Sequence, residues 1–298
     1  MALLQITAAD CAAIADVLET HSARLDIRLS PGSQLRGLID DLRWLGDGAP
    51  NAAQPDAAMA IDRNRAALAF PRYEQALRIA RALVLLDDSP AARAKVRLLK
   101  GSFDRLHSLD GQSQDALFEL EVAGRLVARQ VAVSFAEPDI VIFPGTPGQM
   151  ALACKRPRRQ GRLADCIRRA AAQIRQNPPG VIVVGVEALL QRDPVSGRPI
   201  LYTVSTPEEF HDGVDQHLAT TVQGARRALE RAFLNGSVMG ALFCGIVTAW
   251  SSSPSAYLWK WAHHVVPNNN IQGVPETLAA LDDLMFGTPG TGTSTEST

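Results

Sequence analysis

The chain has 298 residues, a length that corresponds to about two domains of ordinary size and that can bury a full hydrophobic core. It carries 30 Lys and Arg against 31 Asp and Glu, and this net charge of −1 argues against a polybasic protein that coats nucleic acid by charge alone. Lysine is scarce, because 26 of the 30 cations are arginines and the remaining four are Lys95, Lys100, Lys155 and Lys260.

Cysteine usage and the first residues predict a cytoplasmic protein. Cys11, Cys154, Cys166 and Cys244 are scattered without a CxxC pair, a pattern that argues against zinc fingers and disulfide frameworks. The N-terminus lacks a basic segment before an apolar one, so it is expected to form a helix and not a signal peptide. The uncharged stretch 232–250 is interrupted by Asn235-Gly236-Ser237, and its remainder predicts a buried strand with no membrane contact.

In chain order, the first predicted unit is a helical N-terminal region, 1–110. Helical spacing of apolar residues occupies 1–46 and about 59–110, and loop-forming residues at 47–58 separate the two blocks.

A second unit, 111–286, mixes helices and strands, and this pattern predicts an α/β fold with a mixed sheet. Its first part is expected to contain a helix at 114–129, strands at 131–135, 139–143 and 149–155, a helix at 161–176 and a strand at 180–189. Its second part is expected to add an edge strand at 197–205, a helix at 207–234, a strand at 238–250 and a helix at 275–285. The tail 287–298 is of low complexity and is expected to be disordered.

Strand periodicity places chemically useful side chains together. A hairpin of 139–143 with 149–155 can bring Asp139 and Lys155 side by side, and Glu119 lies on the helix that must pack against this sheet. Converging carboxylates suit Mg²⁺, and a lysine beside them supplies a compact charge whose pKa can shift.

These residues carry a resemblance. Glu119, the PDI segment at 138–140, ALACKRP at 151–157 and the following helix resemble the PD-(D/E)XK nuclease superfamily, which has the restriction-endonuclease-like fold. The predicted order of elements matches the αβββαβ core of that family, over about residues 112–190. The resemblance implies hydrolysis of phosphodiester bonds in nucleic acid with Mg²⁺ or Mn²⁺.

By this resemblance, Glu119 is the helical acidic residue, Asp139 the central metal-binding carboxylate and Lys155 the catalytic lysine. The backbone carbonyl of Cys154 is the remaining metal ligand, and Gln173 matches a glutamine of the next helix.

The chain departs from the family at Ala153, where an Asp or Glu is expected. Three accounts remain open: a deliberate replacement that inactivates the protein, a migration of the acid to Asp165 on the following helix, or a natural protein that binds nucleic acid and does not cut it. Loss of one of two ligating carboxylates weakens a Mg²⁺ site strongly.

Each residue also has a purely structural interpretation. Asp139 can cap a turn, and Lys155 can protect an edge strand from aggregation. Glu119 can be a solvated helix residue or half of an intrahelical pair with Arg125 or its neighbours.

The stretch 151–175 has a local charge of +7, since eight cations face the single acid Asp165. Such a stretch suits a nucleic-acid backbone, although a solvated helix face gives the same pattern. The candidate contacts are Arg156, Arg158, Arg159, Arg162, Arg168, Arg169 and Gln173.

Two further clusters favour structural roles. Trp250, Tyr257, Trp259 and Trp261 are typical of a core or a subunit interface, which leaves a homo-oligomer open. His263 and His264 are adjacent, so they point different ways and do not suit a metal site.

The favoured hypothesis is therefore a metal-dependent nuclease, with DNA favoured over RNA, that Ala153 can render inactive. The alternative is a catalytically dead nuclease fold that binds nucleic acid or a partner in a defence or repair complex. A third interpretation is a structural or oligomerisation module.

Overall fold

The computed structural model describes most of the second unit and parts of the first. The described residues are 8–24, 29, 33–46, 76, 79–80, 83, 94–96, 98, 111–142, 149–175, 178–190, 202–234, 236–252 and 255–287. The predictions for the loop at 47–58, for most of the block 59–110, for the turn at 143–148 and for the tail from 288 lie outside the described residues. Within these ranges, no helix combines the length and the hydropathy that crossing a bilayer requires.

In the described part of the chain, seven strands form one mixed sheet with the order β1-β2-β3-β4-β6-β5, and β7 pairs with β6. Their bounds are β1 Val133–Ser134, β2 Ile140–Ile142, β3 Met150–Lys155, β4 Gly180–Gly185, β5 Tyr202–Val204, β6 Val238–Ser252 and β7 Ser255–Pro267. Strands β3, β4, β6 and β5 are parallel, whereas β1, β2 and β7 pair with their neighbours in antiparallel fashion. The parallel strands therefore end at one edge of the sheet.

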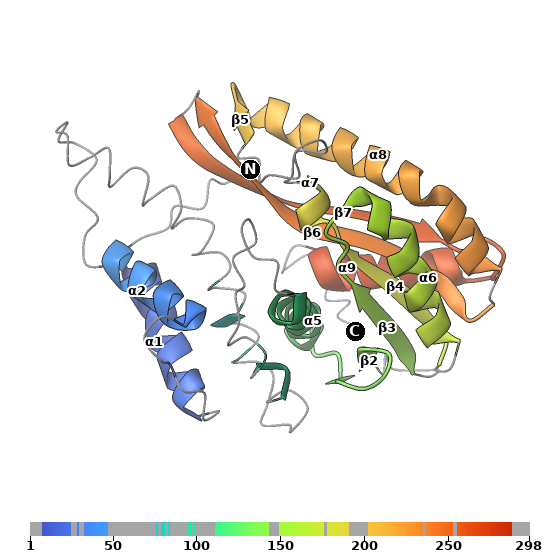
Figure 1. Ribbon diagram of the computed structural model, residues 1–298, viewed down its shortest axis with the longest axis horizontal. Coiled ribbons are helices and arrows are strands. Elements are labelled where there is room, and N and C mark those ends of the chain that lie inside the picture. The colour runs from blue at the N-terminus through green and yellow to red at the C-terminus, as the bar shows by residue number, and fades with distance from the viewer. Residues whose placement is uncertain are drawn as a thin grey trace, which may run out of the picture.

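Helices cover both faces of the sheet (Figure 1). On one face lie α5 (Gly111–Val127) and α9 (Val274–Phe286), and on the other lie α6 (Leu163–Ile174) and α8 (Pro207–Phe233). The remaining described elements are α1 (Ala8–Arg24), α2 (Gln34–Gly46), the 3-10 turn η2 (Gln160–Arg162) and the short α7 (Glu187–Leu190). This arrangement is the predicted α/β class.

Alternation along the central strands builds two cores. In β4, Val181 and Val183 belong to the apolar cluster on the α5 and α9 face, whereas Ile182 and Val184 belong to the cluster under α6 and α8. A strand buried on both faces has no polar positions, and this explains the continuous apolar run in the sequence. The first cluster also contains residues of α1 and α2, such as Leu18 and Leu38.

The predicted helix, three strands, helix and strand occur in that order as α5, β1, β2, β3, α6 and β4. The predicted strand at 180–189 is too long, because the chain turns after Gly185 and continues as α7. The uncharged stretch 232–250 contains the end of α8 and most of β6, as the interruption at Gly236 predicts.

Strand β7 was not predicted, although its pattern is regular. Trp261 and His263 contact α9, whereas the alternate residues Leu258 and Ala262 belong to the core under α8. Alternation of this kind is the signal of a strand covered on both faces.

Candidate functional site

The structure brings Asp139 and Lys155 into contact at the edge where the parallel strands end. Ile140 pairs with Leu152, so Asp139 lies just before β2 and faces the end of β3. The ammonium Nζ of Lys155 donates a hydrogen bond to Oδ2 of Asp139 at 2.7 Å and another to the carbonyl oxygen of Cys154 at 2.9 Å. The backbone N–H of Cys154 donates to the same carboxylate oxygen at 2.8 Å. The Asp139 carboxylate, the Lys155 ammonium and the Cys154 backbone thus lie together, and the hairpin predicts the proximity of Asp139 and Lys155.

The protein around this pair opposes ionisation of Asp139. Burial raises the pKa of the Asp139 carboxyl above its ordinary value, and the Lys155 charge and the Cys154 N–H partly offset this effect. A carboxyl whose pKa is set by burial and by a specific cation is typical of functional sites. The Cys154 thiol faces the α5 core, where burial raises its pKa well above the ordinary value, so this side chain is not a thiolate.

Glu119 lies on the buried face of α5, with its side chain 9 % exposed. Its ion-pair partner is Lys95, from the N-terminal region. Burial raises the pKa of the Glu119 carboxyl, Lys95 partly offsets this, and the charges of Asp139 and Lys155 also act on it. The structure does not bear out the interpretation of Glu119 as a solvated helix residue, because its side chain is buried. The ion pair within α5 joins Arg125 to Glu121, at 3.9 Å, and not to Glu119.

Ala153 is fully buried under α6. It belongs to the same apolar cluster as Leu163, Ile167 and Ala170. Strand alternation places Ala153 on the same face of β3 as Lys155, and its position lies opposite Asp139 in the β2–β3 pairing. An acid at this position, which the resemblance implies, would therefore be a neighbour of both residues, and an apolar methyl stands there instead.

The structure pairs Asp165 with arginines near it in the chain. Its carboxylate lies 2.8 Å from Arg168 of α6 and 3.6 Å from Arg162, the residue that directly precedes α6. Asp165 is therefore a surface partner of α6 arginines, and the hypothesis of an acid that migrated to this helix finds no support in its position. Gln173, in contrast, lies 3.5 Å from Glu137 and from the carbonyl of Pro138, so α6 contacts the turn that precedes Asp139.

Arg156 does not lie on the surface, contrary to the role predicted for it. Its side chain is 4 % exposed and lies 3.8 Å from Glu187, which is also buried. Glu187 in turn accepts a hydrogen bond from the backbone N–H of Ile246 at 3.3 Å. A Cβ at Gly245 would come within 2.6 Å of Glu187, so glycine is needed for this close approach. Arg156 and Glu187 thus connect the ends of β3 and β4 to the middle of β6.

The other predicted arginines remain at the surface and follow directly after Lys155. Arg158 is half-buried, whereas five arginines in or next to α6 are exposed: Arg159, Arg162, Arg168, Arg169 and Arg175. Helical spacing puts Arg162, Arg169 and Gln173 in one row, on the side of α6 that contacts the turn before Asp139. Arg168 lies elsewhere on the helix circumference. A basic surface therefore extends from the site along α6.

Sequence reasoning missed three charged residues near the site. Lys95 is separated from it by most of the N-terminal region, and Glu187 follows a strand whose end was not predicted. Asp115 lies one helical turn before Glu119, and the loss of solvent raises the pKa of its carboxyl, with the charges of Arg156, Arg158 and Lys155 partly offsetting this. The spacing of Asp115 and Glu119 by four residues on one helix was the available signal.

The donor set at this site is chemically suited to a hard cation but is small. The Asp139 carboxylate and the Cys154 carbonyl both accept hydrogen bonds from Nζ of Lys155, so two oxygens face the same positive charge. Oxygen ligands of this kind suit Mg²⁺ and Mn²⁺. Among the described residues, no group of three His, Cys, Asp or Glu side chains converges on one point. The residues therefore fit a cation held by Asp139 and Cys154, with Glu119 as a neighbouring charge.

The predicted aromatic and histidine clusters are structural where they are described. Trp261 lies under the guanidinium of Arg125, 3.7 Å from the ring centroid, and packs against Phe286 of α9. His263 contacts Asp282 of α9 at 2.8 Å, whereas His264 lies on the other face of β7.

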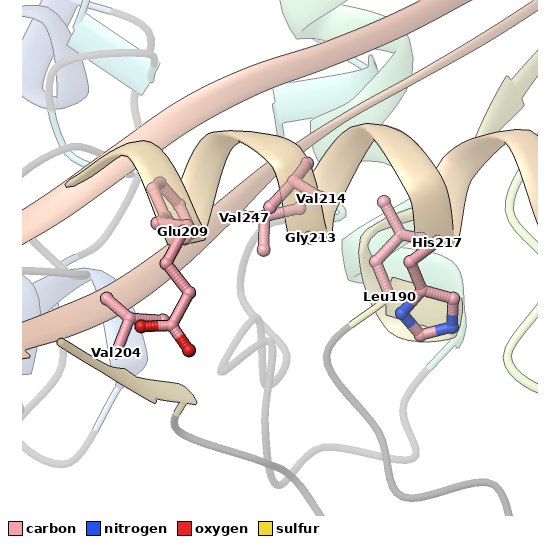
Figure 2. Close-up of a pocket in the computed structure, with 8 residues that line it drawn as sticks. Leu190, Val204, Glu209, Gly213, Val214, His217 and Val247 are labelled. Atoms are coloured by element: carbon pink, nitrogen blue, oxygen red, sulfur yellow. The ribbon is translucent and has the colours of Figure 1, made fainter. Parts of the chain in front are cut away.

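A small apolar pocket lies apart from the site, between α8, α7, β5 and β6. Figure 2 shows Glu209 and His217 of α8 at opposite ends of its lining, with apolar residues between them. Glu209 accepts a hydrogen bond from the Ser205 N–H at 2.7 Å and thereby caps α8. Burial lowers the pKa of His217. None of these lining residues belongs to the group around Asp139.

Comparisons of the chain with protein-family models, with curated proteins and with solved structures found no match.

Proposed function

We propose that the chain is a metal-dependent nuclease-like protein of the PD-(D/E)XK type that acts on phosphodiester bonds, with DNA as the favoured substrate. The observation that supports this most is the contact of Asp139 with both Lys155 and the Cys154 backbone. The order of elements and the position of Gln173 against the turn before Asp139 agree with the resemblance. Mg²⁺ or Mn²⁺ is the proposed cofactor.

In this proposal, each residue has a physical task. When bound, the divalent cation would polarise the phosphate and lower the pKa of an attacking water. Asp139 holds the ammonium of Lys155 and, with the Cys154 carbonyl, contributes oxygen ligands. Lys155 stabilises the negative charge that grows on the phosphate oxygens as water attacks. The exposed arginines of α6 hold the flanking phosphates of the strand.

A second candidate is supported by Ala153. Its methyl lies in an apolar cluster, and the carboxylates of Asp139 and Glu119 are each already compensated by a lysine. A site with this composition suits phosphate binding better than tight metal binding. The second candidate is therefore a nuclease fold that binds nucleic acid without cutting it, alone or as a component of a defence or repair complex.

Incubation with DNA and RNA separates the two candidates. The chain, Ala153→Glu and Asp139→Asn are each tested with Mg²⁺, with Mn²⁺ and with a chelator. Cleavage by the unaltered chain that Asp139→Asn abolishes supports the nuclease. Cleavage by Ala153→Glu alone supports a competent scaffold that has lost its acid. If neither cleaves but the chain binds DNA, the binding protein is favoured, and an absence of both activities contradicts both candidates.

A further inference from the structure

The ion pair of Lys95 with Glu119 joins the N-terminal region to the site. Glu119 is buried on α5, and a buried carboxylate needs a counter-charge because desolvation disfavours its ionised form. Lys95 supplies that charge across 24 residues of chain. Its neighbour Val96 is 2 % exposed within the core that α5 shares, so packing fixes the position from which Lys95 reaches Glu119.

The charge of Lys95 also reaches Asp139. It lowers the pKa of that carboxyl, in addition to the larger influence of Lys155. The site thus combines the carboxylates of Asp139 and Glu119 with the ammonium groups of Lys155 and Lys95, and these four charges sum to zero. A chain that uses arginine almost everywhere places two of its four lysines here. The ammonium group of a lysine is compact enough to occupy the position beside a carboxylate that a small hard cation would otherwise occupy.

We propose that Lys95 is a positioning residue of the site, which holds Glu119 as an internal counter-ion and competes with a divalent cation for this carboxylate. The inference rests on the proposed function and extends it. It makes the site composite, with one of its charges supplied by the N-terminal region. It also means that cation binding through Glu119 requires Lys95 to leave this carboxylate.

Mn²⁺ binding, measured by calorimetry and by electron paramagnetic resonance, tests the competition without any substrate. Lys95→Gln is expected to tighten Mn²⁺ binding by about tenfold, because removal of an ammonium in contact with a carboxylate frees that ligand. The matched control is Lys260→Gln. Lys260 lies apart from the site and forms an ion pair with Asp215 at 2.5 Å, so its loss is expected to leave Mn²⁺ affinity unchanged. Equal Mn²⁺ affinity of Lys95→Gln and the unaltered chain overturns the proposal.

Glu119→Gln provides the reciprocal measurement and is close to isosteric. With Lys95 present, this change is expected to alter Mn²⁺ affinity by about twofold or less, because the carboxylate is already engaged; in the Lys95→Gln background it is expected to remove the gain. A loss of about tenfold or more with Lys95 present contradicts the proposal. This single variant decides the question if Lys95→Gln does not fold.

The outcomes also separate this inference from the proposed function. If the Mn²⁺ measurements behave as expected but no variant cleaves or binds nucleic acid, the proposed function is wrong and the role of Lys95 stands. If the chain cleaves DNA and Lys95→Gln leaves Mn²⁺ affinity unchanged, only the role of Lys95 is wrong.

Discussion

Asp139 and Lys155 meet at 2.7 Å, although 16 residues separate them in the chain. The antiparallel register of β2 and β3 produces this contact, and the Cys154 N–H fixes the carboxylate between two donors. We predict that Lys155→Gln and Asp139→Asn each lower nucleic-acid cleavage by about 100-fold or more, because the first removes the ammonium that stabilises the phosphate charge and the second removes a proposed oxygen ligand of the cation.

Cleavage rates under single-turnover conditions check this prediction, with circular dichroism as the test of folding. The double variant is expected to lose little more than either single variant, because the two residues act as a unit. Losses that multiply in the double variant would show that the two residues act independently. Lys260→Gln is the lysine control.

The exposed arginines should control binding to nucleic acid through charge. Reversal of Arg159 and Arg162 to Glu is expected to weaken DNA binding by about tenfold or more at low salt and to reduce the slope of affinity against salt. Fluorescence anisotropy at several salt concentrations measures both quantities. Arg36→Glu on α2 is the matched reversal, because Arg36 pairs with Asp40 far from α6 in the chain. Salt-independent binding would contradict a phosphate contact.

Arg156 and Glu187 should matter for stability. Both side chains are about nine-tenths or more buried, so Glu187→Gln removes a buried negative charge from beside the Arg156 guanidinium. We expect a loss of about 3–5 kcal/mol in the free energy of unfolding, measured by urea denaturation. The surface variant Asp165→Asn is the control and is expected to cost about 1 kcal/mol or less. An equal effect of the two variants would show that the buried pair contributes no more than a surface pair.

The pH dependence follows from the raised pKa of Asp139. Protonation of this carboxyl removes the partner of Lys155 and a proposed oxygen ligand of the cation, so cleavage should fall as the pH drops through a value above the ordinary 3.8. Asp139→Asn should abolish this acid limb in a profile of cleavage rate against pH. An acid limb centred at or below 3.8 would contradict the burial of Asp139.

Raised carboxyl pKa values also determine how the stability of the fold depends on pH. The pKa values of Asp115, Glu119 and Asp139 are all raised, so the folded chain binds these protons more tightly than the unfolded chain. Their contribution to stability is present below the unfolded pKa values and is lost as the pH rises through the folded ones. Glu119→Gln removes part of this dependence, which melting temperatures between acid and neutral pH can measure.

Ala153→Glu tests whether an acid at the position that the proposed nuclease type expects can support cleavage. The larger side chain enters the cluster of Leu163 and Ile167, so we expect a loss of about 1–3 kcal/mol in stability from overpacking. If its carboxylate reaches Lys155, Mg²⁺-dependent cleavage should rise at the same time. Thermal melts and cleavage assays on one preparation separate the two effects, with Ala153→Gln as the uncharged control of similar size.

The contact of Asp139 with Lys155 could be predicted because strand periodicity and a short hairpin determine it locally. The burial of Arg156 could not, because its partner Glu187 comes from another strand end and the local sequence contains only a run of arginines. Lys95 was missed for a related reason, since its contact depends on how a distant segment packs through Val96. Strand β7 was missed because its aromatic residues suggested a core cluster more strongly than their alternation suggested a strand.

The apolar cluster on the α5 face contains Leu18 and Leu38 of the N-terminal helices together with Leu120 and Leu152. A chain shortened to begin at residue 111 would therefore lack part of the apolar core against which α5 packs. The truncation would expose the apolar face of α5 to water, and the fragment is expected to associate with other copies or with chaperones and proteases. The N-terminal helices and the α5 face of the sheet share one apolar core, so replacement of either part requires repacking of the other.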